Sequence, residues 1–301
     1  SDGKPGHENQ STGLAEALRR RTGATVECVR LDVTKSVWSR MREAKALKAG
    51  AECPQLLIAA GHTTHLPVLA AARAFGARSV VIMKPSLPLW LFDLCLVPRH
   101  DVKSGQEEGR RMLITQGALN RISENDPVKT KTGLILVGGP SRHHDWAGEP
   151  LLAAIADVVR REPALQWTLT DSRRTPEGFV ERITALNLPA LTLVPHTRTA
   201  PGWLPERLLA AQEAWVTEDS ISMIYESITA GARTGLLPMP VKDASGRIAK
   251  AVDTAVSAGY AVRYGNWRET GMIPVIPAPL HEAARCADEV LSRFFQGAPT
   301  G

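Results

Sequence analysis

The sequence predicts an α/β protein built from two doubly wound, mainly parallel sheets. Short apolar runs rich in β-branched residues alternate with helical apolar patterns along most of the chain, which is typical of parallel α/β units. The alternation pauses once, over residues 120–132. With 301 residues, 44% of them hydrophobic and 22% charged, the chain has ordinary globular composition and is long enough for about two domains.

The expected strands are apolar runs too short for helices, a pattern that suits strands covered on both faces of a sheet. They are residues 26–31, 56–60, 80–83, 94–97, 112–115, 134–137, 167–170, 191–194, 214–217 and 235–237. Helical apolar spacing fills the intervals between them. The expected helices are residues 10–21, 66–75, 149–161, 177–185, 205–210, 222–230, 248–257 and 281–295.

The polar stretch NRISENDPVKTKT at 120–132 predicts a linker, because it carries a proline and has no periodicity. We therefore expect one domain over residues 1–125 and a second over residues 126–301. The final helix could pack on its own domain or back on the N-terminal one. Because the chain opens on Ser1 in a loop-like stretch, we also expect a strand ahead of this residue.

Composition excludes several classes of protein. No apolar run approaches the roughly 18 residues of a membrane-spanning helix, and the nearest, 87–97, contains Pro88 and Asp93. The four cysteines stand far apart without a CxxC pair, which argues against a zinc ribbon or a disulfide framework and favours a reducing, cytoplasmic compartment. Nucleic acid is not an expected partner, since only 5% of residues are aromatic and no recognition motif occurs.

The net positive charge is confined to the first part of the chain. Residues 1–128 hold 18 Lys and Arg against 13 Asp and Glu, whereas residues 129–301 hold 18 of each. Five basic residues between 35 and 48 face only Glu43, in a segment that also contains apolar residues; they are Lys35, Arg40, Arg42, Lys45 and Lys48. The segment is either an ordinary surface helix or a basic amphipathic helix that lies on an anionic membrane.

Strand-to-helix junctions are the places to look for chemistry, because ligands of open α/β sheets bind at the carboxyl ends of strands. The first junction is DGKPGHENQ at 2–10, where Gly3 and Gly6 allow a tight turn and the following helix start favours an anion or a polar group. His7 at this place could act as a general base, or could merely cap the helix.

The second junction is GHTTH at 61–65, which follows the strand expected at 56–60. Thr63 or Thr64 could cap the next helix, and His62 could face a substrate. Two histidines three residues apart also allow a metal site, but no third ligand of matching character is present, so no metal is expected.

The third junction is GGPSR at 138–142, directly after a buried strand. A glycine pair lets backbone amides approach a diphosphate, and Ser141 and Arg142 can add donors. The loop is neither a Walker A sequence nor GxGxxG. Further along, the strand at 167–170 ends in DSRRTP at 171–176, which contains Arg173 and Arg174, and the strand at 191–194 ends in Pro195 and His196.

The strand expected at 214–217 leads through TEDSISM at 217–223 into a helix. Asp219 or Ser220 would cap that helix, so the Ser220 and Ser222 hydroxyls would cluster with free amides at its positive end. Glu226 lies one to two turns further on and could accept hydrogen bonds from the two hydroxyls of a ribose. It could equally be an ordinary exposed glutamate.

Four of these motifs, in this order, resemble the mitochondrial fission family named for the plant elongated-mitochondria factor: DGKPGHENQ, GGPS, SRRTP and TEDSISM with Glu226. More remotely, the layout is similar to GT-B glycosyltransferases, in particular those that add N-acetylglucosamine to a lipid-linked peptidoglycan precursor. The resemblance implies two Rossmann-like domains that face each other across a cleft, with the acceptor on the N-terminal domain and the nucleotide sugar on the C-terminal one.

The junctions and the resemblance together give the candidate site residues. The resemblance implies His7 as the catalytic base, and the acceptor-side candidates are Gly3, Gly6, Asn9, Gly61, His62 and Thr63. At the donor the candidates are Gly138, Gly139, Ser141, Arg142, Ser172, Arg173, Arg174, His196, Asp219, Ser220, Ser222, Met223 and Glu226. No metal or other cofactor is expected, and the donor is expected to be UDP-linked.

Two functions follow as hypotheses. The first is a metal-independent glycosyltransferase acting on a hydroxyl acceptor, for which the basic first half would favour an anionic, membrane-borne substrate. The second is a non-catalytic adaptor that retains the GT-B fold and is peripheral on a membrane. A nucleotide-sugar epimerase is rejected, because the chain has no GxGxxG and no YxxxK.

Overall fold

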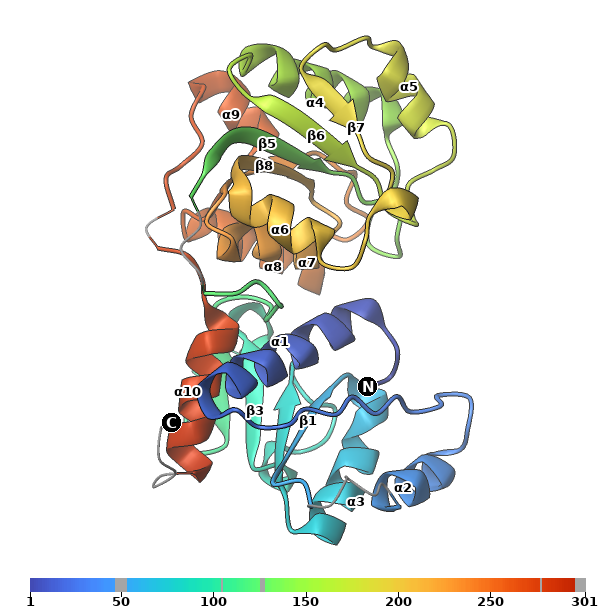
Figure 1. Cartoon of the computed structure of the whole chain (residues 1–301), viewed down its shortest axis with the longest axis vertical. Coiled ribbons are helices and arrows are strands. Elements are labelled where there is room, and N and C mark those ends of the chain that lie inside the picture. Colours follow the sequence, from blue (N-terminus) through green and yellow to red (C-terminus); the bar gives the residue numbers. More distant parts are fainter. Residues whose placement is uncertain (47–52, 104, 125–127, 277, 296–301) are drawn as a thin grey trace. The chain divides into compact units, whose positions relative to one another are not determined.

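A computed structural model describes residues 1–46, 53–103, 105–124, 128–276 and 278–295 of the chain (Figure 1). The chain forms two compact units. Unit 1 consists of Ser1–Ser123 together with His281–Gly301, and unit 2 consists of Glu124–Leu280. The chain therefore passes from one unit to the other twice.

Unit 1 is built on a parallel four-stranded sheet whose strands lie in sequence order: β1 (Leu56–Ala60), β2 (Arg78–Ile82), β3 (Leu94–Pro98) and β4 (Met112–Thr115). Its helices are α1 (Pro5–Thr22), α2 (Val37–Lys45), α3 (His65–Phe75) and α10 (Glu282–Phe294). The final helix α10 packs on α1.

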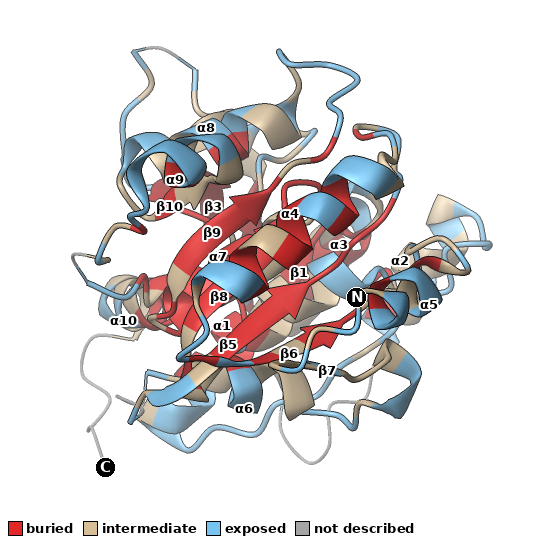
Figure 2. Ribbon diagram, turned by 90° about the horizontal axis from the view of Figure 1, so that it is seen from above, coloured by how far each residue is buried: buried red, intermediate tan, exposed pale blue. Residues whose placement is uncertain are grey.

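The sheet of unit 1 has an apolar layer on each face, because successive side chains of a strand point to opposite sides. Val80 of β2 and Leu96 of β3 belong to the layer under α1 and α10, which also contains Leu14 and Cys286. Val81 and its neighbours on the other face pack against α3. Burial on both faces explains why these strands are almost wholly apolar (Figure 2).

Unit 2 contains a parallel six-stranded sheet in the order β10-β9-β8-β5-β6-β7. The strands are β5 (Thr130–Leu136), β6 (Gln166–Thr170), β7 (Leu191–Leu193), β8 (Ala211–Thr217), β9 (Arg233–Leu237) and β10 (Ala261–Arg263). The helices are α4 (Gly148–Arg161), α5 (Phe179–Ala185), α6 (Trp203–Ala210), α7 (Ile221–Thr229), α8 (Arg247–Ser257) and α9 (Tyr264–Thr270). Since β5 lies between β6 and β8, the strand order reverses there, and in such sheets ligands bind at this switch point.

Two tryptophans fill the core of unit 2 against strand glycines. Gly133 of β5 pairs with Trp167 of β6, and Gly235 of β9 pairs with Trp215 of β8. A Cβ atom on either glycine would overlap the paired indole ring. The glycines thus make room for large buried side chains inside strands where glycine is otherwise unfavourable.

The α/β class with parallel sheets is confirmed, and the strands predicted at 56–60 and 112–115 occur with those bounds. The strand predicted at 26–31 is wrong. This segment is extended, and its backbone hydrogen bonds to the first residue run from Ser1 N–H to Val29 O and from Leu31 N–H to Ser1 O. The Arg30 side chain pairs with Glu8, and most of the segment is exposed. The strand β10 and the short helix α9 were not predicted.

The predicted linker over 120–132 is also partly wrong. Asn120 and Ile122 are buried in unit 1, where the Asn120 carbonyl lies against Gly13 of α1, and β5 already begins at Thr130. Residues 125–127 lie outside the described part of the chain. The basic segment after Lys35 forms α2, whereas Lys48 lies outside the described residues.

Candidate functional site

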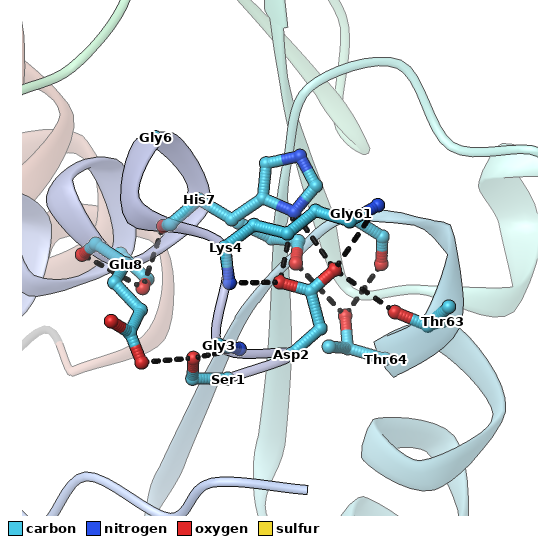
Figure 3. A network of polar contacts seen from close by, with 12 residues as sticks. Ser1, Asp2, Gly3, Lys4, Gly6, His7, Glu8, Gly61, Thr63 and Thr64 are labelled. Carbon is cyan, nitrogen blue, oxygen red and sulfur yellow. Dashed lines mark hydrogen bonds and ion pairs between the residues drawn. The ribbon is translucent and has the colours of Figure 1, made fainter. Parts of the chain in front are cut away.

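In unit 1 a carboxylate and an imidazole form a pair at the carboxyl end of β1 (Figure 3). The first junction is shorter than predicted, because α1 begins at Pro5, which is favoured at a helix start. His7 consequently lies in the first turn of α1, and its ring is directed at Asp2. The Nδ1 atom of His7 is 3.0 Å from both carboxylate oxygens of Asp2.

The Asp2 side chain is fully buried and ionised. Burial by itself would raise the pKa of this carboxyl, but hydrogen bonds from the Lys4 amide, from His7 and from the Thr63 hydroxyl together hold the pKa below its usual value. An ionised carboxylate only accepts hydrogen bonds, so Nδ1 of His7 carries the proton. In the neutral form of this imidazole the lone pair is therefore on Nε2, the atom directed away from Asp2.

The loop after β1 completes this pair. Gly61 has φ +91°, and a Cβ atom there would lie 2.6 Å from Cε1 of His7, so only glycine lets the ring rest on the loop. Thr63 donates its hydroxyl to Asp2 and accepts at its carbonyl from Nη1 of Arg40, a residue of α2 (3.0 and 2.9 Å). Asp2 was missed as a site residue, although an aspartate five residues before a candidate base was a usable signal.

The structure brings Gly61 to His7 and Thr63 to Asp2, and the Gly3 amide binds Ser1 rather than an outside group. Asn9 lies two residues beyond His7 in α1, and Gly6 and His62 are exposed. His65 is a core residue. Burial, aided by the neighbouring His62, lowers its pKa to about 4, and its ring packs edge-on against Phe92.

In unit 2 the glycine pair lies at the switch point, at the end of β5. The two amides expected to face a diphosphate are engaged within the unit. Gly138 N–H donates to the Thr217 hydroxyl (2.8 Å), and Gly139 N–H donates to the Asp219 carboxylate (3.1 Å). In this structure both amides of the glycine pair therefore have partners within unit 2, and their binding of a diphosphate stays a prediction.

The glycine pair instead lets three loops meet. A Cβ atom on Gly138 would overlap the Asp219 carboxylate, and one on Gly139 would overlap the Arg174 carbonyl. Arg174 ties the loops together by an ion pair to the buried Asp219 (2.7 Å) and a hydrogen bond to the Gly139 carbonyl (2.7 Å). Asp219 is therefore a buried anchor of the loop that leads into α7.

The start of α7 also lies at this edge. Ser220 directly precedes the helix, and Ser222 and Met223 lie in its first turn, where backbone amides have no partner within the helix. The Ser222 hydroxyl lies 3.4 Å from a carboxylate oxygen of Glu226, which is half-buried one turn further along. The ends of β5 and β8 thus bring together the glycine pair, Asp219, Ser220 and Glu226.

The remaining predicted donor residues flank this edge. The Ser141 hydroxyl accepts from the amides of His143 and His144, Arg142 is exposed and contacts His143, and Arg173 is exposed. The Ser172 amide donates to the Thr175 hydroxyl, and the Ser172 hydroxyl accepts from the Arg174 amide.

A second carboxylate and imidazole pair follows β6 and β7. Nδ1 of His196 is 3.0 Å from Asp171, which also accepts from the His196 amide. Asp171 was not predicted, because the residue types alone do not say which of several loop carboxylates faces His196.

Among the described residues, no three His, Cys, Asp or Glu side chains gather as a metal site requires. Within the same residues, no helix is both long and apolar enough to span a bilayer.

The family model for the mitochondrial fission protein ELM1 matches residues 5–294. This chain belongs to the ELM1 mitochondrial fission family. No curated protein sequence matches it.

The fold is that of GT-B nucleotide-sugar enzymes. The chain is similar to UDP-GlcNAc 2-epimerase of Methanocaldococcus jannaschii at a TM-score of 0.60 and 10% identity, over 96% of this chain and 98% of that one. It is similar to the glycotransferase of kitacinnamycin at a TM-score of 0.54 and 14% identity, over 97% of both chains. A putative UDP-N-acetylglucosamine 2-epimerase of Listeria monocytogenes has a TM-score of 0.55 and 12% identity, over 89% of this chain and 81% of that one.

Proposed function

We propose that this member of the ELM1 family is a glycosyltransferase that moves a sugar from a nucleoside diphosphate donor to a hydroxyl acceptor. In this proposal unit 2 binds the donor and unit 1 receives the acceptor. The observation that carries it is the buried Asp2 carboxylate fixed on His7, because a hydrogen-bonded carboxylate orients an imidazole for proton transfer. The similarity in fold supports the choice of donor class.

His7 is the general base of this reaction. Its Nε2 lone pair takes the proton of the acceptor hydroxyl while the acceptor oxygen bonds to the anomeric carbon of the sugar. The bond from that carbon to the phosphate oxygen breaks, and its electron pair leaves with the nucleoside diphosphate. Asp2 holds the ring in the required tautomer and stabilises the imidazolium that forms.

The donor lies at the start of α7 in this proposal. Helix amides near Ser220 and Ser222 bind the diphosphate, and the Glu226 carboxylate accepts from the ribose hydroxyls. The helix dipole and the exposed Arg173 compensate the charge of the leaving diphosphate, so the scheme requires no divalent metal.

The first experiment tests donor binding by thermal shift with UDP and a panel of UDP-sugars. We expect stabilisation of the wild type and its loss in Glu226→Ala. The matched control is Glu269→Ala, an exposed glutamate of α9 in the same unit, which should retain the shift. No nucleotide response in the wild type would contradict the proposal.

The second experiment tests the base with the donor found in the first. We expect His7→Asn to lower turnover by roughly 10²–10⁴-fold while the thermal shift with donor persists. Asp2→Asn should lower turnover as well, since it removes the ionised acceptor that fixes the tautomer. Turnover unchanged in His7→Asn would overturn the role of His7.

Product analysis separates transfer from epimerisation. The missing GxGxxG and YxxxK exclude epimerases that use these motifs, but two of the similar structures are 2-epimerases, so the fold itself is compatible with that activity. A glycosyltransferase releases free UDP and forms a glycoside only with acceptor. Conversion of the UDP-sugar into its epimer without UDP release would replace the proposal.

The second candidate function, a membrane adaptor, is favoured by one observation on α2. Trp38 is 74% exposed, and Arg42 and Lys45 lie four and seven positions further on, so the three share one exposed helix face. An aromatic ring beside cationic groups suits the surface of an anionic membrane. Arg40, in contrast, turns inward to Thr63 and is not part of this face.

Vesicle sedimentation tests the adaptor. We expect binding to phosphatidylcholine vesicles only when phosphatidylglycerol is included, and its loss in Trp38→Ala and in the double variant Arg42→Ala with Lys45→Ala. The control is Arg73→Ala, an exposed arginine of α3. Membrane binding with no nucleotide response would favour the adaptor over the enzyme.

A further inference from the structure

Unit 1 has a hollow of about 380 Å³ that the proposed reaction does not use. Four arginines line it: Arg78, Arg110, Arg111 and Arg293. Arg78 opens β2 and Arg111 directly precedes β4, so the hollow lies at the amino ends of these strands. The His7 pair lies at the opposite, carboxyl edge of the same sheet, about 16 Å of strand away.

Two guanidinium groups of the hollow, those of Arg111 and Arg293, are held by backbone carbonyls. Arg111 donates to the carbonyls of Trp90 and Phe92 (2.7 and 2.9 Å), and Arg293 donates to those of Gly109 and Arg110 (2.9 and 3.3 Å). Backbone carbonyls fix the direction of a guanidinium without cancelling its charge. This arrangement preorganises cationic donors around the hollow.

Carboxylates neutralise only part of this charge. Asp93 pairs with Arg78 and Glu289 pairs with Arg293, whereas in the described part of the chain Arg110 and Arg111 make no ion pair. Within the described residues, the exposed Arg110 guanidinium makes no hydrogen bond or ion pair. Like charges gathered in this way repel one another unless an anion lies between them.

The hollow also has an apolar wall. The Phe294 ring lines it, and the Arg78 guanidinium lies over this ring, 5.5 Å from the ring centroid. The space is within the range of small-molecule sites and exceeds what a bare inorganic ion needs. A ligand with a phosphate group and an organic remainder matches both the charge and the wall.

We propose that the arginine hollow, lined by Arg78, Arg110, Arg111 and Arg293, is a binding site for a phosphate-bearing ligand that is separate from the donor site of unit 2. Guanidinium forks match phosphate oxygens in pairs, which a lysine cluster does not. The phosphate belongs either to a soluble phosphorylated molecule or to a lipid headgroup.

Inorganic pyrophosphate is the probe, with hydrogen–deuterium exchange as the local readout at ionic strength matched with sodium chloride. We expect pyrophosphate to protect amides near residues 109–111 and 292–294. Protection there should vanish in Arg110→Glu, weaken in Arg110→Ala with a roughly tenfold higher Kd, and persist in Arg73→Ala. Arg110 is suited to replacement because it is exposed and its side chain has no hydrogen bond or ion pair with the residues that the structure describes.

The outcomes are distinct from those at the donor site. Protection near residues 220–226 reports that site and should be the same in Arg110→Glu as in the wild type. Absence of protection at the hollow in the wild type, or protection that Arg110→Glu leaves intact, overturns the proposal whatever happens at 220–226.

A vesicle arm identifies the source of the phosphate. If phosphatidic acid vesicles bind through Arg110 and pyrophosphate competes with them, the ligand is a lipid headgroup. If pyrophosphate protects the hollow but these vesicles bind equally to Arg110→Glu and the wild type, the ligand is soluble.

Discussion

Replacement of Gly61 by alanine is the sharpest test of how the loop after β1 supports His7. Gly61 has φ +91° and ψ 145°, a region that is nearly restricted to glycine and costs another residue about 1–3 kcal/mol. The new Cβ would also lie 2.6 Å from Cε1 of His7, and overpacking of this kind costs about 1–3 kcal/mol. We therefore expect Gly61→Ala to lower the free energy of unfolding of unit 1 by about 2–6 kcal/mol.

A control and a double variant separate the two contributions. Gly76 also has positive φ (+67°) but has no neighbour within 4 Å of its Cβ position, so Gly76→Ala should cost about 1–2 kcal/mol. In a His7→Ala background the ring is gone, and Gly61→Ala should then cost about 1–3 kcal/mol less than in the wild type.

Hydrogen exchange of the buried amides of β2 and β3 measures the stability of unit 1 without requiring the whole chain to unfold in one step. An equal cost of Gly61→Ala in both backgrounds would refute the contact between the loop and His7.

Three further predictions concern stability. The folded pKa of Asp2 is lowered, so the contribution of this carboxylate to the stability of unit 1 is fully present above the ordinary pKa of 3.8 and is lost as the pH falls below it. Between pH 5 and pH 3 the wild type should therefore lose more stability than the variant Asp2→Asn. Acid titrations followed by circular dichroism measure this difference. Arg174→Ala should destabilise unit 2 by about 1–2 kcal/mol, because the buried Asp219 carboxylate keeps its hydrogen bond from the Gly139 amide but loses its ion pair. Unchanged hydrogen-exchange rates in β5 and β8 would contradict this prediction. Trp38→Ala should change the unfolding free energy by less than about 0.5 kcal/mol in urea titrations, since the side chain is 74% exposed, and a larger loss would show that it packs on the protein instead.

Apolar patterning predicted most of the strands because both faces of each sheet are covered. Runs such as 94–97 consist of apolar residues, because a parallel strand that is buried on both faces rarely accommodates polar side chains. The pattern failed where burial is low. Residues 26–31 are apolar apart from Glu27 and Arg30, yet in the structure their backbone bonds to Ser1 and most of them are exposed.

The site residues were predictable as loop positions, but their partners were not. Sequence placed the glycine pair at the end of a strand, where backbone amides commonly bind phosphates. Which groups those amides bind depends on Thr217 and Asp219, about 80 residues further along the chain. In the same way, Asp2 takes its role from Thr63 and Gly61, which no local pattern connects with it.

The return of α10 to unit 1 affects how a newly synthesised chain matures. The apolar layer under α1 includes Cys286, Ala287 and Val290, which the ribosome makes after every residue of unit 2. Unit 2 is one uninterrupted segment and holds all six of its strands by Arg263. We expect unit 2 to become protease-resistant first during translation, while the nascent N-terminal segment exposes apolar surface and depends on chaperones until the last helix emerges.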